Sequence, residues 1–200
     1  HIIGTNFDVM IDQQFGIISG YGDVRKLIFT GNEFSNTYSS EILMENQIGE
    51  TEITGNLFNG AFPTIFFMTH GGNNVTSLQK VYNNTFDMVD ADPTYRGAAV
   101  TINGAYRRSP STDLGDGKFT NVLITGNTIK NLPYTSYPEW RGIYLINQDP
   151  DGAGGEVVNA VISYNIISGV IGNNAIGIKF YGKITGTVMN NNTITGVATG

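Results

Sequence analysis

Acidic and basic side chains that can act in catalysis are spread along this 200-residue chain, which has no cysteine and two histidines. Paired carboxyl groups can divide the general acid and base roles, and a histidine or lysine can act as a base beside cations that stabilise developing negative charge. The candidate carboxylates are Glu45, Asp87, Asp90, Asp92, Glu139, Asp149 and Asp151. The candidate bases and cations are His70, Arg96, Arg107, Arg108, Arg141 and Lys179. No local catalytic motif joins these residues, so the fold must decide which of them meet.

A six-residue pattern recurs from end to end: an apolar residue, two others, an asparagine, one more residue, and a second apolar residue. The clear copies contain Asn32, Asn56, Asn84, Asn127, Asn165 and Asn192, and a weaker copy surrounds Asn6. A repeat near 25 residues with short apolar runs is typical of a solenoid. Each repeat holds about three short strands rich in β-branched residues, without helical periodicity.

We therefore expect an all-β fold with one domain over residues 1–200, built from about seven coils and three parallel sheets. The asparagines should stack in one turn as a ladder of side-chain amides. Asparagine also tolerates the left-handed conformation that such a turn needs. No capping element is visible at either end of the repeat, so we expect a fragment of a longer solenoid.

Composition excludes several classes of function. The net charge of −6 argues against a nucleic-acid partner. No apolar run of 18 residues is present, so no membrane span is expected. No Cys/His set with zinc spacing occurs, so we expect no structural metal. The 26 glycines and 14% charged residues suit a turn-rich β protein.

The repeat resembles the right-handed parallel β-helix of the pectin-lyase-like superfamily, which includes polysaccharide lyases, C5-epimerases, polygalacturonase-type hydrolases and phage tailspikes. This resemblance covers the whole chain and makes the repeat asparagines structural. It implies that the asparagine turn joins the second and third sheets, and that carbohydrate lies on the outer face of the first sheet. The first sheet would comprise residues 41–45, 64–68, 99–103, 142–146 and 175–179.

Strand alternation predicts which side chains of this first sheet face outward. The expected outward residues are Leu43, Glu45, Phe66, Met68, His70, Thr101, Asn103, Tyr144, Ile146, Gln148, Lys179 and Tyr181. Long connections at 104–118 and 130–141 flank the same sheet, so they should wall a groove. The alternative is that these connections fold down and bury the face.

The resemblance implies a protein that binds and cleaves an extended polysaccharide in this groove. The residues expected to bind substrate are Phe66, Arg96, Trp140, Arg141, Tyr144 and Tyr181. The residues expected to be catalytic are Glu45, His70, Asp149 and Lys179.

In a hydrolase, Glu45 and Asp149 would divide the acid and base roles. Their strands are about three steps apart, or roughly 14 Å, so Asp149 needs a closer partner such as Glu139 or Asp151 unless the loops close that gap. In a lyase or epimerase, His70 or Lys179 would be the base. Arg96 or Arg141 would then neutralise the uronate.

The alternative function is a non-catalytic carbohydrate-binding or structural β-helix segment of a spike or adhesin. Both readings place the protein outside the cell, on a virion surface or in the periplasm, and the tailspike reading implies a homotrimer. No cofactor is expected, except that Asp149, Asp151 and Glu156 supply oxygen ligands of the kind that calcium prefers. This segment does not match the EF-hand pattern, because its fifth position is Ala153.

Overall fold

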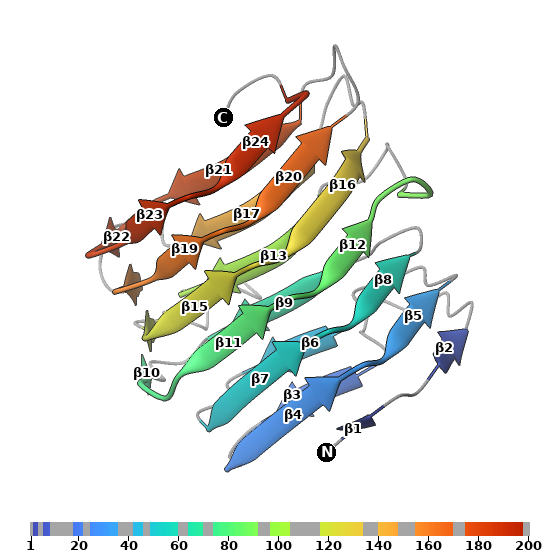
Figure 1. Ribbon diagram of the computed structural model, residues 1–200. Helices are drawn as coiled ribbons and strands as arrows, with labels where there is room; N and C mark the ends of the chain where they lie inside the picture. The colour runs from blue at the N-terminus through green and yellow to red at the C-terminus, as the bar shows by residue number, and fades with distance from the viewer. Residues whose placement is uncertain are drawn as a thin grey trace, which may run out of the picture.

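The computed structural model describes residues 2–3, 6–8, 18–21, 25–35, 42–45, 49–59, 64–69, 74–91, 97–104, 117–133, 140–147, 155–169 and 175–197, with side chains from residue 25 onward. All of its regular structure is strand, and every strand pair is parallel. Figure 1 shows the strands stacked in order, from β1 and β2 at one end to β22–β24 at the other. The expected all-β solenoid of parallel sheets is confirmed.

The strands form four sheets, named A to D here, and successive members of each sheet come from successive repeats. Sheet A contains β1 (Ile2–Ile3), β4 (Lys26–Thr30), β7 (Glu50–Thr54), β11 (Gln79–Tyr82), β15 (Val122–Thr125), β19 (Val161–Ser163) and β23 (Val188–Asn190). Sheet B contains β2 (Asn6–Asp8), β5 (Glu33–Ser35), β8 (Leu57–Asn59), β12 (Thr85–Asp87), β16 (Thr128–Leu132), β20 (Ile166–Gly169) and β24 (Thr193–Thr195).

Sheet C is the first sheet of the sequence analysis. It contains β3 (Ile18–Tyr21), β6 (Ile42–Glu45), β9 (Ile65–Met68), β13 (Gly97–Asn103), β17 (Trp140–Ile146) and β21 (Ile176–Tyr181). Sheet D was not predicted, and it contains β10 (Asn74–Val75), β14 (Lys118–Thr120), β18 (Glu156–Val158) and β22 (Ile184–Thr185). Its strands lie between those of sheets C and A along the chain. Because they are only two or three residues long, no separate apolar run marks them in the sequence.

The asparagine ladder joins sheets A and B, as expected. The side-chain amide of Asn56 donates to the Oδ1 of Asn84 at 2.9 Å and to the carbonyl of Phe29 at 3.1 Å. Its own Oδ1 accepts from the backbone and side-chain nitrogens of Asn32, both at 2.9 Å. The same pattern of side-chain donation continues through Asn127 to Asn192. Each inner amide thus uses both donors and its acceptor, which removes the cost of burying it.

Two expectations about the ladder need correction. The left-handed residue of the turn is the one before each ladder asparagine, as the φ values of 64° at Gly126, 56° at Tyr164 and 53° at Asn191 show. The ladder asparagine instead supplies the hydrogen bonds. In addition, Asn6 pairs with Glu33, one position beyond Asn32, so the weak first copy of the pattern is out of register with the ladder.

The core is one continuous column of inward side chains. Phe34, Phe58 and Phe86 stack in sheet B, with ring centroids 4.8 and 4.7 Å apart and nearly parallel planes. Their spacing follows the separation of neighbouring strands, so each ring lies directly over the one before. A regular column of this kind holds the outer surfaces of the sheets in fixed register.

Candidate functional site

The outer face of sheet C carries the residues on which the functional prediction depends. Inward residues such as Ile65 and Ile143 belong to the core cluster. Leu43, Met68 and Ile146, each of which follows an inward residue on β6, β9 or β17, do not belong to it. Alternation along β6, β9 and the part of β17 from Ile143 to Ile146 therefore runs as expected. The side chains predicted to face outward on these strands do so.

Strand register arranges these outward residues in two parallel rows. The first, called the outer row, consists of Leu43, Phe66, Thr101, Tyr144 and Lys179. The second, called the rim row, consists of Glu45, Met68, Asn103, Ile146 and Tyr181. Neighbours in a row lie one strand apart, or about 4.8 Å.

The two rows differ in exposure. In the outer row, Phe66, Thr101, Tyr144 and Lys179 are all partly exposed, and only Leu43 is buried. In the rim row, Glu45 is 7% exposed and Asn103 only 1%, while Tyr181 at the end reaches 57%. The face is therefore neither fully exposed nor fully buried, and the two rows differ. The outer row is the part of the face that a ligand can reach.

An irregularity in β17 brings Arg141 to the same face as Tyr144. A Cβ on Gly142 would lie 2.9 Å from the core side chain of Ile167 and 2.6 Å from the carbonyl of Gly177, so this position faces inward and has room only for glycine. Ile143 also faces the core. Because Gly142 and Ile143 both face inward, Arg141 before them and Tyr144 after them both face outward.

The consequence is a cation–π contact: the Arg141 guanidinium carbon lies 4.5 Å from the centroid of the Tyr144 ring. Arg141 itself is only 9% exposed. Lys179 is the register partner of Tyr144 on the next strand, so a second cationic residue occupies the neighbouring position of the outer row. Simple alternation would have put Arg141 and Tyr144 on opposite faces. The glycine at 142 was the available signal for this arrangement, and sequence reasoning missed it.

Trp140 requires a correction. It was expected in a loop that walls the groove, but it begins β17 and is completely buried in the core. Its ring lies where a side chain on Gly97 would be, within 2.2 Å of the position of a Cβ. The indole therefore fills the space left by a glycine on the neighbouring strand, and it is not available to stack on a ligand at the outer face.

The predicted catalytic residues are not brought together in the described part of the chain. Glu45 on β6 and Lys179 on β21 are four strands apart, roughly 19 Å, which is too far for one catalytic centre. His70, Arg96, Asp149 and Asp151 lie outside the described residues. Their roles stay predictions, as does the groove between the connections 104–118 and 130–141, of which residues 105–116 and 134–139 lie outside the described residues.

Two candidate carboxylates are already engaged. Asp87 on the outer face of sheet B lies 2.7 Å from Lys130 and accepts a 2.8 Å hydrogen bond from Asn131. Burial opposes its ionisation, but these contacts outweigh that effect and hold the pKa of Asp87 below its ordinary value.

Glu156 in sheet D was a candidate calcium ligand. It accepts a 2.6 Å bond from Thr185 and lies 3.2 Å from Lys118 and 3.5 Å from Lys183. The Thr185 hydrogen bond, followed by the lysines, lowers the pKa of Glu156. Two ammonium groups beside this carboxylate disfavour a further cation. No cluster of three acids or histidines with metal-binding geometry occurs among the described residues.

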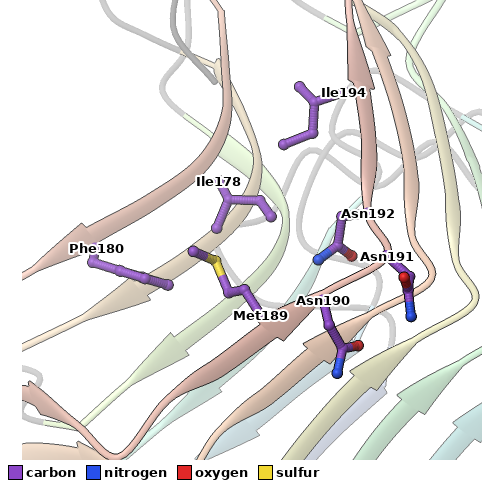
Figure 2. A pocket seen from close by; sticks show the side chains of 7 residues that line it. All are labelled: Ile178, Phe180, Met189, Asn190, Asn191, Asn192 and Ile194. Carbon is purple, nitrogen blue, oxygen red and sulfur yellow. The ribbon is translucent and has the colours of Figure 1, made fainter.

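A hollow of about 460 Å³ lies at the end of the stack, away from sheet C's outer face. Its lining residues are Ile178, Phe180, Met189, Asn190, Asn191, Asn192 and Ile194 (Figure 2). These residues come from the inner side of β21, from β23 and β24, and from the turn between the last two. The hollow is therefore the uncovered end of the core.

Comparison of the chain with protein-family models, with curated proteins and with solved structures gives no match in any of the three. Within the described ranges we find no helical segment that could serve as a membrane span.

Proposed function

We propose that this solenoid is a right-handed parallel β-helix of the pectin-lyase-like superfamily with about seven coils. Parallel sheets in sequential order support this assignment. The ladder between sheets A and B lies where the superfamily pattern expects it, between the second and third sheets. Right-handed crossover between parallel strands is also the general rule.

We further propose that an extended polysaccharide binds along the outer row of sheet C. The observation that carries this proposal is the Arg141–Tyr144 cation–π pair on a partly exposed ring, with Lys179 at the neighbouring position of the outer row. Phe66 lies two strands from Tyr144, roughly 10 Å, so both rings can contact one extended chain. Aromatic faces provide apolar contact area, and the cations suit acidic or hydroxyl groups.

Cleavage of that polysaccharide is the second part of the proposal. Elimination is the version better supported by the described residues, because Arg141 can neutralise a uronate while Lys179 serves as the base. His70 is the other candidate base, and it lies outside the described residues. Hydrolysis by Glu45 requires a second carboxyl group within reach. The next residues along the rim row, Met68 and Asn103, do not supply one.

Binding is tested by calorimetry against a panel of neutral and acidic polysaccharides. The Tyr144→Ala variant should bind the best ligand at least tenfold more weakly than the unchanged protein. The matched control is Tyr164→Ala, which removes an exposed ring from the turn between sheets A and B and should leave affinity unchanged. Equal affinity of the Tyr144→Ala variant and the unchanged protein would remove the outer row from the proposal.

Product analysis separates the catalytic versions. Elimination produces an unsaturated uronate with a new ultraviolet absorbance, whereas hydrolysis produces reducing ends without it. In the elimination version, Lys179→Ala and His70→Ala identify the base by loss of turnover with binding retained. Full activity in both variants would exclude both residues.

The second candidate function is a non-catalytic carbohydrate-binding or structural segment of a spike or adhesin. It is favoured by one observation: Glu45 is the only carboxylate among the described side chains on the outer face of sheet C. Binding without turnover of any polysaccharide would support this reading. An extracellular, virion-surface or periplasmic location is part of both proposals, and sedimentation analysis would test the homotrimer that a tailspike-like protein implies.

A further inference from the structure

Two polar side chains interrupt an inward-facing row of sheet A. Strand register places Leu27, Thr51, Gln79 and Val122 side by side in this row. Val122 belongs to the core cluster and Leu27 packs against it. Thr51 is 1% exposed and Gln79 is 0% exposed, so both lie inside the solenoid. Because burial of a hydroxyl or an amide costs free energy unless it is hydrogen-bonded, each of their polar atoms needs a partner.

The amide nitrogen of Gln79 has its partners. Nε2 donates to the carbonyl of Gly49 at 2.9 Å and to the carbonyl of Ser77 at 3.2 Å. These two bonds use both amide hydrogens, and they fix the orientation of the amide, because the reversed orientation would place its oxygen against two carbonyl oxygens. The side chain therefore reaches from β11 to the preceding coil, where Gly49 comes two residues before Thr51.

Two buried oxygens remain without a hydrogen-bond partner within the part of the chain that the structure describes. They are Oε1 of Gln79 and Oγ1 of Thr51. The two residues are register partners on neighbouring strands, so their backbones lie about 4.8 Å apart. One molecule that bonds to both oxygens can span up to about 5.6 Å, or two hydrogen bonds of about 2.8 Å each. A single small ligand can therefore join them.

The chemistry of the two oxygens indicates which ligand this is. An amide oxygen can only accept a hydrogen bond, whereas a hydroxyl can donate and accept. A water molecule meets both requirements, because it donates to one oxygen and accepts from the other group. Calcium would need about six oxygen ligands or more, and an amide oxygen with a hydroxyl does not approach that number. Buried waters in proteins typically bond to polar groups that have no other partner.

We propose that Thr51 and Gln79 hold one buried water molecule, which donates to Oε1 of Gln79 and accepts from the hydroxyl of Thr51. The site lies at the corner between sheets D and A. Gln79 belongs to the coil of β10, which is the first strand of sheet D, and the described part of the preceding coil has no strand in that sheet. At this corner the Gln79 amide takes the place of a strand as the partner of the Gly49 carbonyl.

The water would give this corner a polar connection between two coils, as the asparagine ladder does at the turn between sheets A and B. A polar group that is satisfied in only one register favours that register over its alternatives. The inference concerns the stability and register of the solenoid, and it does not depend on the proposed polysaccharide function.

A high-resolution crystal structure of the unchanged protein is the direct test. We expect electron density for one water molecule within hydrogen-bonding distance of both Oε1 of Gln79 and Oγ1 of Thr51. A direct hydrogen bond between the two side chains would overturn the proposal. So would the absence of density beside them with the two oxygens still apart.

The Thr51→Val variant tests the same site in solution, because it removes the hydroxyl and nearly keeps the shape. If the hydroxyl bonds to a water, the variant should lower the equilibrium constant for folding about fivefold, as measured by urea unfolding. A hydroxyl without a partner predicts the opposite sign, because valine would then remove an unsatisfied polar group. An unchanged or more stable Thr51→Val protein would therefore contradict the proposal.

Two further variants make this measurement specific. The matched control is Thr30→Val, on the outward side of β4 and partly exposed, which should change the folding constant by less than about twofold. In the Gln79→Met background the water loses its second partner, so Thr51→Val should no longer destabilise the protein. An equal loss from Thr51→Val in both backgrounds would show that no water joins the two side chains.

Discussion

The inner coils and the last coil have the same kinds of residues in the same register, yet only the inner coils form a closed core. Ile124, Ile162 and Met189 occupy equivalent inward positions, and their exposures are 0%, 0% and 52%. The difference arises because a solenoid coil buries its apolar side chains against both neighbours. An inward pattern in the sequence therefore specifies direction, and the neighbouring coils specify burial.

The largest contrast is expected from core truncation. Phe58 is fully buried between Phe34 and Phe86, so Phe58→Ala should lower the free energy of unfolding by about 4 kcal/mol. Ile194→Ala in the last coil should cost about 1 kcal/mol, because this side chain is already partly exposed. Urea unfolding of both variants measures the contrast. Equal losses would mean that the end of the stack is covered in solution.

Removing ladder amides should give the next largest contrast. Asn127→Ala removes two donated and two accepted hydrogen bonds and leaves their buried partners unsatisfied, so we expect a loss of about 2–3 kcal/mol. Within the described residues Asn192 has hydrogen-bond partners on one side only, so Asn192→Ala should lower the free energy of unfolding by about 1 kcal/mol. Thermal and urea unfolding check both values, and a neutral Asn127→Ala variant would show that the ladder contributes little to stability.

Substitutions at the left-handed position of the turn should have smaller effects on stability, and the two substitutions described here should act in opposite directions. Gly126 has φ 64°, and a Cβ there would lie 2.5 Å from Asn83 Oδ1, so Gly126→Ala should cost about 1–2 kcal/mol. Tyr164 holds the equivalent position at φ 56° with its ring 63% exposed. Tyr164→Gly should therefore stabilise the protein by about 0.5 kcal/mol, after the extra flexibility of glycine in the unfolded chain is subtracted. Destabilisation by Tyr164→Gly would indicate that the exposed ring makes a contact in solution.

The smallest effect is expected from Glu156, whose carboxylate connects the last coil to the inner ones through Thr185 and Lys183. Because its pKa is lower in the folded protein, its contribution is fully present above the ordinary value of 4.5 and is lost as the pH falls through the folded pKa. Glu156→Gln should be less stable than the unchanged protein at pH 7, and the difference should shrink as the pH falls below 4.5. A pH-independent difference would mean that the charge of Glu156 does not stabilise this connection.

The part of the candidate site that follows the alternation of side chains along each strand could be predicted from the sequence. Phe66, Tyr144 and Lys179 were placed on the outer face from their spacing alone, because residues two apart in a strand share a face. Arg141 and Trp140 could not be placed in this way. The close approach of Gly142 to Gly177, and of Trp140 to Gly97, depends on contacts between strands that are more than 30 residues apart in the chain.

The sequence by itself determined the parallel solenoid, the asparagine ladder and the inward side chains of each strand, because these follow from a repeat that every coil shares. Only the tertiary structure decided the short sheet D, the burial of the rim row from Glu45 to Ile146, the packing of Arg141 on Tyr144 and the exposure of the last coil. Each of these features depends on which atoms of a neighbouring coil lie beside it. A repeat pattern does not say where a neighbouring coil deviates from the repeat or leaves a face uncovered.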